Sequence, residues 1–317
     1  MKLKKLLSLL IMGMVVLAAT VPLVSAQDDT IRIGMVNLTQ SAPYFIGMSR
    51  AVEEEAAVYE NVELIITDAN GDIAKLVSDV EDVLAQDVDG IIISAGWINS
   101  APAALDAIQA AGVPVVLVDR KLTGGEYTSW IGPDNYTIGV QNGEYIVERL
   151  NGEGVLVVLR GGPEDNTIGL DRTNGMLSVV ESSNIEVIVA PNFGEWSEDG
   201  GFTLMEDMLA QHERIDAVFC ENDSMCLGAQ KAIADAGRSE EMFLVGVDGQ
   251  KEALVEIMNG TNYAATGLNN SDQIGRAAFH RLMAILAGAQ APKDTAFPSP
   301  RITVDNVQRF YNPDSVF

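Results

Sequence analysis

Short apolar runs alternate with stretches of helical periodicity along most of this chain. Runs of this length between polar segments are typical of buried β-strands. They predict nine strands, at Ile31–Asn37, Val62–Thr67, Ile91–Ser94, Val113–Asp119, Val155–Arg160, Ile185–Val189, Ala217–Cys220, Phe243–Val247 and Ala264–Leu268. Between the second and third runs, apolar residues from Ile73 to Leu84 follow helical spacing behind Asp72, a good N-cap. This alternation of strand and helix predicts an α/β fold with parallel sheets.

The strand predicted at Val113–Asp119 carries the first candidate site. Its apolar run is nearly continuous, as expected for a strand buried on both faces, and Asp119 at its end is followed by Arg120. Ligands bind beyond the carboxyl ends of the strands in open α/β sheets. A carboxylate offers hydrogen-bond acceptors and a guanidinium offers donors in a fixed fork, so the pair suits one small polar molecule.

A repeat within the chain supplies a counterpart to Asp119. The segment Glu81–Gln86 (EDVLAQ) returns as Glu206–Gln211 (EDMLAQ), and each copy leads into an acidic turn and an apolar strand. The next strand in each half ends in Val–Asp, at Asp119 and at Asp248. We therefore expect two similar α/β domains whose strand-end aspartates face each other across a cleft, a preferred place for a small-molecule site.

Aromatic residues stand in equivalent loops of the two predicted halves. Tyr44 and Phe45 follow the first strand, and Trp196 follows a strand of the second half. An aromatic face suits the apolar C–H face of a sugar ring, and charged groups suit its hydroxyls. Ordinary core packing is the alternative for each of these rings.

Three further polar residues lie beside predicted helix starts. Arg172 suits either a binding site or a surface salt bridge. Asn222 and Asn269 precede predicted helices, where asparagine is also a good N-cap, so the pattern leaves both roles open.

The first 26 residues predict a secretory signal peptide. Lys2, Lys4 and Lys5 precede a long apolar stretch that closes with Val24–Ala26, an A-x-A-like site. We expect cleavage after Ala26 rather than a retained membrane anchor, because a polar segment follows. No cysteine lies near the cut, so a lipid-anchored form is not expected. The protein should then be periplasmic or secreted.

The composition beyond residue 26 narrows the range of partners. All 45 acidic residues lie there with 17 of the 20 Lys and Arg, which gives a formal charge of −28. Such a chain repels nucleic acid and anionic lipid, and we expect a soluble monomer.

The length and the cysteine content add two further expectations. About 290 residues predict two domains. The cysteines are Cys220 and Cys226; export would allow a disulfide, but we expect buried free thiols.

The common catalytic and cofactor signatures are missing from the sequence. No G-x-G-x-x-G follows the first strand, and no P-loop or G-x-S-x-G is present. His212 and His280 are the only histidines, and neither has a neighbouring Cys or His. We expect a protein without catalytic activity, cofactor or metal.

Taken in order, these motifs resemble the ribose-binding family of periplasmic sugar-binding proteins, the type I receptors of ABC transporters. The matching segments are Pro43–Phe45, Val113–Arg120, Asp134–Asn135, Arg172, Asn222–Asp223, Val245–Gly249 and Asp272–Gly275. The resemblance implies two similar doubly wound parallel-sheet domains joined by a three-crossing hinge. The first would comprise residues 27–132 and 270–300, and the second residues 133–269 and 301–317.

The resemblance also implies a set of ligand-binding residues. Ring-stacking aromatics would be Tyr44, Phe45 and Trp196, and the groups that bind hydroxyls would be Asp119, Arg120, Arg172, Asn222, Asp248 and Asn269. Asn269 stands where ribose binders carry a glutamine. Ala42, Ala95 and Val247 replace two asparagines and a phenylalanine of the ribose pattern, and we expect Trp97 to fill space vacated at Ala95.

These departures argue against assuming ribose, because another pentose, a hexose, a polyol or a cyclitol fits equally well. The resemblance implies a non-enzymatic receptor that delivers its ligand to an ABC permease. The alternative is a sensor of a sugar or a furanose-like signal that docks a chemoreceptor or a kinase ectodomain. The related DNA-binding repressors are excluded by the leader segment and the charge of −28. A secreted enzyme on this fold would need a nucleophile or base that the sequence does not show.

Overall fold

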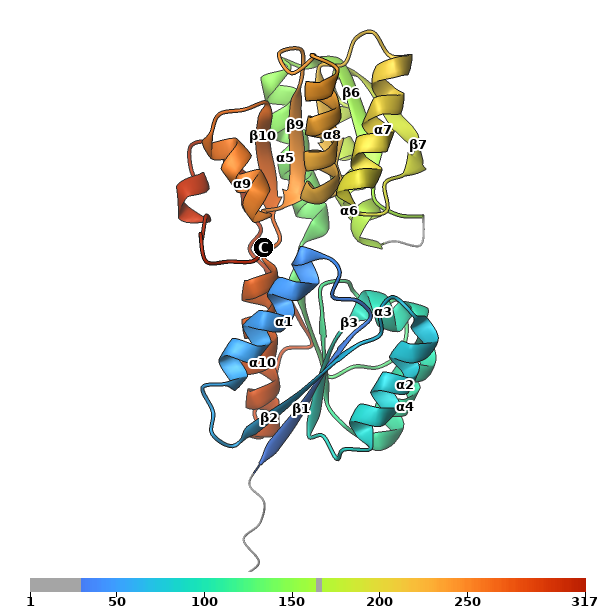
Figure 1. Ribbon diagram of the computed structural model, residues 1–317, viewed down its shortest axis with the longest axis vertical. Helices are drawn as coiled ribbons and strands as arrows, with labels where there is room; N and C mark the ends of the chain where they lie inside the picture. The colour runs from blue at the N-terminus through green and yellow to red at the C-terminus, as the bar shows by residue number, and fades with distance from the viewer. Residues whose placement is uncertain (1–29, 164–166) are drawn as a thin grey trace, which may run out of the picture.

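The protein consists of two α/β lobes stacked along its long axis (Figure 1). The computed structural model describes residues 30–163 and 167–317. The segment predicted as a signal peptide, residues 1–26, lies outside this range. Among the helices of the described residues, none is long and apolar enough to cross a membrane.

The first lobe is built on a six-stranded parallel sheet with the order β11-β5-β4-β3-β1-β2. Its strands are β1 (Ile31–Asn37), β2 (Val62–Asp68), β3 (Gly90–Ser94), β4 (Val115–Val118), β5 (Ser129–Pro133) and β11 (Asp294–Phe297). Its helices are α1 (Pro43–Ala56), α2 (Ile73–Leu84), α3 (Ala95–Ser100), α4 (Pro102–Ala111) and α10 (Ser271–Leu286). Helices α1 and α10 cover one face of the sheet, and α2 and α4 cover the other (Figure 1).

The second lobe repeats this plan with the order β12-β10-β9-β8-β6-β7. Its strands are β6 (Glu153–Arg160), β7 (Asn184–Phe193), β8 (Ala217–Cys220), β9 (Phe243–Asp248), β10 (Tyr263–Leu268) and β12 (Arg301–Thr303). Its helices are α5 (Asn135–Arg149), α6 (Thr167–Val180), α7 (Glu198–Gln211), α8 (Asp223–Asp235) and α9 (Lys251–Met258), with a short 3₁₀ turn at Val307–Arg309. Edge strand β12 is antiparallel to β10, whereas β11 is parallel to its neighbour.

The internal repeat corresponds to equivalent elements of the two sheets. The repeated hexapeptide ends α2 in one half and α7 in the other, and the strands that follow, β3 and β8, hold the same place in their sheets. The next strands, β4 and β9, are also equivalent, so Asp119 and Asp248 come from matching strand ends. The chain passes between the sheets after β5, after β10, and between β11 and β12.

All nine predicted strands are present, and three more were not predicted. The strand β4 is shorter than expected because Pro114 has no N–H to donate and Asp119 has a left-handed backbone, with φ of 67°. The three additional strands are β5, β11 and β12. Each is short, and none carries the long apolar run by which the others were predicted.

Cys220 and Cys226 form a disulfide, so the expectation of free thiols was wrong. Cys220 is the last residue of β8 and Cys226 lies in the first turns of α8. The tight turn between these elements brings their Cα atoms to 5.4 Å, within the range that a disulfide spans. The bond closes a loop that carries Asn222.

Candidate functional site

A cleft of about 520 Å³ lies between the two lobes, at the carboxyl ends of the parallel strands of both sheets. All ten residues predicted for the site line this cleft: Tyr44, Phe45, Trp97, Asp119, Arg120, Arg172, Trp196, Asn222, Asp248 and Asn269. Its volume falls in the range of small-molecule sites, about 300–1,000 Å³. The position agrees with the rule that open α/β sheets bind ligands beyond their strand ends.

Several cleft residues have an unusual backbone conformation. The φ angles are 67° at Asp119, 50° at Glu195, 60° at Trp196 and 123° at Asp248. Seven non-glycine residues of the described chain have positive φ, and these four all line the cleft. A bulky residue such as Trp196 adopts this conformation only when its surroundings enforce it. The folded chain therefore holds these side chains in the cleft at a conformational cost.

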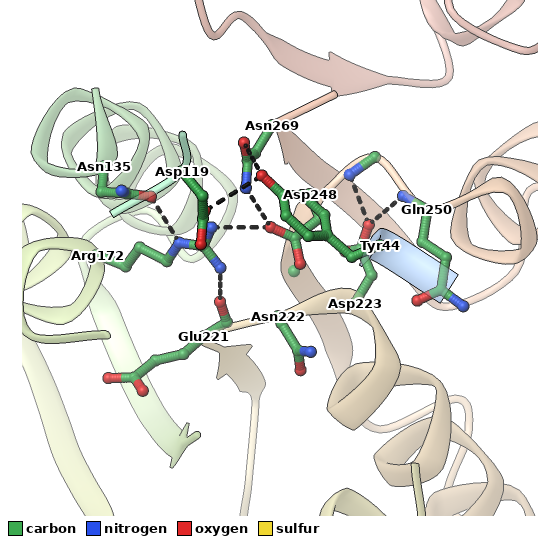
Figure 2. A network of polar contacts seen from close by, with 12 residues as sticks. Tyr44, Asp119, Asn135, Arg172, Glu221, Asn222, Asp223, Asp248, Gln250 and Asn269 are labelled. Carbon is green, nitrogen blue, oxygen red and sulfur yellow. Dashed lines mark hydrogen bonds and ion pairs between the residues drawn. The ribbon is translucent and has the colours of Figure 1, made fainter. Parts of the chain in front are cut away.

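A chain of polar contacts joins the two strand-end aspartates (Figure 2). The Tyr44 hydroxyl lies 3.2 Å from Asp119 Oδ1 and 3.1 Å from Asn269 Oδ1, so it can donate to either. Asn269 Nδ2 in turn donates to Asp248 Oδ1 over 3.1 Å. Asn270, rather than Asn269, caps helix α10, which leaves the Asn269 side chain free for this bridge between the lobes.

Arg172 is buried, with 2% of its surface exposed, and each of its three guanidinium nitrogens has one partner, which leaves two of its five N–H groups for a ligand. Its Nη2 pairs with Asp248 Oδ1 at 2.8 Å, its Nε donates to Asn135 Oδ1 at 2.9 Å, and its Nη1 donates to the Glu221 carbonyl (Figure 2). A surface salt bridge, the alternative considered from the sequence, is thus ruled out. A Cβ on Gly139 would lie 2.1 Å from the Arg172 carbonyl oxygen, so this glycine lets α5 approach α6 closely enough to place the arginine.

Asn222 caps helix α8 and also lines the cleft. Its Oδ1 accepts from the Met225 N–H at 3.0 Å, and its Nδ2 donates to the Trp196 carbonyl at 3.1 Å. The two roles considered from the sequence are therefore combined in one residue.

Below the cleft, the buried carboxylate of Asp223 supports the turn that follows Asp248. Its Oδ2 accepts the N–H groups of Gly249 and Gln250, both at 2.8 Å. Its Oδ1 accepts from the hydroxyls of Tyr263 at 2.7 Å and Thr266 at 2.8 Å. These bonds tie the turn to β10 and so fix the direction of the Asp248 side chain.

Burial raises the pKa of the three aspartates that build the site. The pKa of Asp248 rises to about 6 because burial outweighs the stabilising Arg172 guanidinium. The pKa of Asp223 rises to about 7, again through burial, with a contribution from the nearby Asp248 charge. Burial also raises the pKa of Asp119, against the opposing effect of Arg120 and Arg172. The cleft therefore holds carboxylates that would gain from ligand hydroxyl donors.

Aromatic side chains form two walls. In the first lobe, Tyr44 meets Phe45 edge to face at 5.2 Å, and Phe45 packs on Trp97 at 4.5 Å. In the second lobe, Trp196 lies against Gly161, where an added Cβ would fall 2.4 Å from the indole. The Arg120 guanidinium lies 5.7 Å from the Trp196 ring centroid, a cation–π contact between the lobes.

This arrangement suits reversible binding of a small polar molecule. Fixed acceptors on opposite walls can each take hydroxyl donors, the two guanidiniums can donate, and the aromatic faces can cover apolar C–H groups. Within residues 30–163 and 167–317, no group of three or more His, Cys, Asp or Glu is placed to hold a metal ion.

Part of the lining was not among the ten residues predicted for the site. The further residues are Thr39, Ser41, Ala42, Pro43, Ile168, Glu195, Ser197, Glu198, Ser224, Gln250 and Phe317. Gln250 follows the strand-end Asp248 by two residues, so the strand-end argument could have found it. Phe317 lies far along the chain from every predicted strand, and no pattern in the sequence connects it with the cleft.

A second, wider hollow of about 890 Å³ lies at the far end of the second lobe. It includes Asp216, Phe243 and Asn262, which stand at the amino ends of β8, β9 and β10. None of the ten predicted residues reaches it.

Comparison with known proteins places the chain in a family. Residues 33–290 match the family described as periplasmic binding protein domain. The ribose import binding protein of Bacillus subtilis (strain 168) is 30% identical over 274 residues, covering 86% of this chain and 88% of the relative.

Solved structures agree with this match. An ABC transporter solute-binding protein from Bacillus halodurans C-125, with bound myo-inositol, superposes with a TM-score of 0.82 at 25% identity, covering 90% of this chain and 99% of the other. The fructose-binding periplasmic domain of a hybrid two-component system gives a TM-score of 0.79 at 31% identity, covering 88% and 92%. With its two mostly parallel six-stranded sheets and a cleft between them, the chain belongs to the type I periplasmic binding proteins, among the ribose-binding-like solute-binding proteins of ABC transporters.

Proposed function

We propose that this protein is an extracytoplasmic receptor that binds a neutral monosaccharide, polyol or cyclitol in the cleft and delivers it to an ABC permease. The relatives that bind ribose and myo-inositol support this class of ligand. Residues 1–26 would direct export. The hinge would connect the first domain, residues 27–132 and 270–300, with the second domain, residues 133–269 and 301–317.

One observation carries the proposal. Two strand-end aspartates, each beside an arginine, come from equivalent positions of the repeated halves and line one cleft between aromatic walls. Carboxylates accept from hydroxyls, while Arg120 and Arg172 can donate to ligand oxygens. A polyhydroxylated ring or chain can use the carboxylate acceptors and the arginine donors at the same time.

The charge of the cleft favours a neutral ligand. The charge of Arg172 is already offset by its ion pair with Asp248, and the charge of Arg120 is offset by the neighbouring Asp119 carboxylate. Glu195 and Glu198 add negative charge at the exposed rim. An anionic sugar acid would meet this excess of carboxylates and bind less well.

A sensor is the second candidate function. The fructose-binding relative is part of a hybrid two-component system, so a similar domain there belongs to a signalling protein. Loss of uptake of the bound sugar on deletion of this gene would support transport. Unchanged uptake together with a lost transcriptional or chemotactic response would favour the sensor.

The proposed ligand class is tested by native mass spectrometry for a co-purified ligand, followed by thermal shifts with D-ribose, D-fructose, xylitol and myo-inositol. A ligand at about 100 times its dissociation constant should add about 2.7 kcal/mol of stability. A matched panel of sugar acids should give smaller shifts. A protein that neither carries a ligand nor responds to any neutral member of a broad sugar and polyol panel would overturn the proposal.

A further inference from the structure

Residues 312–317, which we term the strap, are hydrogen-bonded to both lobes. On the side of the second lobe, Lys251 Nζ at the start of α9 donates to the carbonyls of Pro313 and Ser315, at 2.6 and 2.8 Å. On the side of the first lobe, the Ser315 hydroxyl lies 3.1 Å from Asp272 Oδ2, in the first turn of α10. The strap therefore runs across the hinge region, and Figure 1 marks its end between the lobes.

The strap places Phe317 in the cleft. Phe317 lines the cleft with 8% of its surface exposed, and its ring stands at 87° to that of Tyr44 with the centroids 5.3 Å apart. Its backbone N–H donates to Ser315 Oγ at 3.2 Å, which closes the turn. A Cβ on Gly47 would lie 3.1 Å from Phe317 Cβ, so helix α1 leaves room for this ring.

The Tyr44 side chain is held by two ring contacts and by its hydroxyl. Phe45 and Phe317 both meet its ring edge to face, and its hydroxyl is engaged with Asp119 and Asn269. Without Phe317, the Tyr44 ring would lose one of its two aromatic neighbours and could move away from the aspartate.

We propose that Phe317 is a positioning residue of the cleft, which holds Tyr44 against Asp119 and so sets the width available to a ligand. This inference rests on the proposed function, because it takes the cleft as the ligand site. Nothing in the ribose-binding pattern described above involves this residue.

The first experiment measures ligand affinity by calorimetry with D-ribose and with myo-inositol. Phe317→Ala removes the ring, and Lys251→Met releases the strap without changing any residue that lines the cleft. Each of these two variants should weaken binding by about twofold to tenfold, the contribution of one aromatic pair. Each should also change the ratio of the affinities for D-ribose and myo-inositol. Phe317→Leu, which restores most of the apolar volume, should recover part of the lost affinity.

Two matched controls separate positioning from a general loss of stability. Lys231→Met removes the same charge from α8, and Phe202→Ala removes a partly buried ring from α7; neither residue lines the cleft. Both should keep the wild-type affinities and their ratio. The inference is overturned if Phe317→Ala and Lys251→Met behave like these controls.

A second experiment works without any ligand. A double-mutant cycle of Tyr44→Leu and Phe317→Leu, read by urea unfolding, should show coupling of about twofold to tenfold in the unfolding constant. If neither sugar nor the wider panel binds the wild-type protein, the proposed function fails, and this cycle alone decides the inference. Additive effects in the cycle would overturn it, and coupling would support it.

Discussion

At the scale of single residues, the site is built from side chains held in costly conformations. Asp119 and Asp248 both end equivalent strands with positive φ, and both are largely buried. An aspartate tolerates the left-handed region better than most residues, because its short side chain can hydrogen-bond locally. The same residue type therefore satisfies the backbone at the strand end and presents an acceptor to the cleft.

Asp119→Asn should weaken ligand binding while leaving the fold intact. Asparagine also tolerates the left-handed φ of 67°, so the backbone is preserved and only the charged acceptor is lost. We expect binding to weaken by about 2–4 kcal/mol, the scale for disrupting a buried charged hydrogen bond. Calorimetry measures the change, with exposed Asp106→Asn as the control. Wild-type affinity in the Asp119 variant would remove this residue from the site.

Binding should also weaken as the pH falls from 7.5 to 5. The ionised carboxylate is the form that accepts two hydroxyl bonds, and the pKa of Asp248 in the free protein is about 6. At pH 5 about one site in ten would be ionised, so the dissociation constant should rise about tenfold if the ligand binds only that form.

The same groups affect stability in the opposite direction. The pKa values of Asp119, Asp223 and Asp248 are raised above their unfolded values. The stability they contribute is therefore fully present below their unfolded pKa and is lost as the pH rises through their folded pKa.

The pH dependence of ligand binding is tested with the variant Asp248→Asn, which should flatten it. An affinity that is constant from pH 5 to 7.5 in the wild type would show that ionised Asp248 is not required for binding.

At the scale of elements, the junction of β8 and α8 organises the second wall. The Cys220–Cys226 bond closes this junction, Asn222 caps α8 and holds the Trp196 carbonyl, and Asp223 holds the turn after Asp248. One short loop thus determines the position of two cleft residues that lie on other elements.

Asp223→Ala should lower affinity more than Asp223→Asn. Alanine leaves the N–H groups of Gly249 and Gln250 without their acceptor, whereas asparagine keeps one oxygen for them. We expect the alanine variant to lose more than about 1.5 kcal/mol of binding, the scale of a buried unsatisfied group, and the asparagine variant to lose much less. Calorimetry well below both unfolding temperatures is the measurement. Equal affinities for the two variants would show that these hydrogen bonds do not position the site.

Sequence patterns predicted the strongly periodic elements and the chemistry at their ends. The long apolar strands and the repeated hexapeptide were sufficient to place Asp119 and Asp248 on facing walls. The edge strand β12 has only three residues and little apolar content, so its formation depends on pairing with the neighbouring strand rather than on its own sequence. The disulfide was missed because the spacing of Cys220 and Cys226 gives no distance, and Phe317 was missed because its contact with Tyr44 is long-range.

At the scale of the whole molecule, ligand binding should move one lobe relative to the other. The lobes share three chain crossings, and Arg120 of the first lobe lies over Trp196 of the second. A ligand that contacts both walls binds the closed arrangement more tightly and so shifts the population toward it.

Tryptophan fluorescence should therefore report binding through Trp196. The described residues include two further tryptophans: Trp130 is buried in the first lobe, and Trp97, also largely buried there, lines the cleft. We expect a saturable change in emission on titration with the tightest sugar of the panel. The change should be smaller in Trp196→Phe, where Trp97 still lines the cleft. A wild-type signal in that variant would mean that closure does not alter the environment of Trp196.

A crystal structure of the complex with the tightest ligand of the panel shows directly whether the ligand lies in the cleft between the lobes. We predict a sugar or polyol between the Tyr44–Phe45 wall and Trp196. Its hydroxyls should lie about 2.5–3.0 Å from carboxylate oxygens of Asp119 and Asp248. Ligand bound instead in the hollow near Phe243 and Asn262, with the interdomain cleft holding only water, would contradict it.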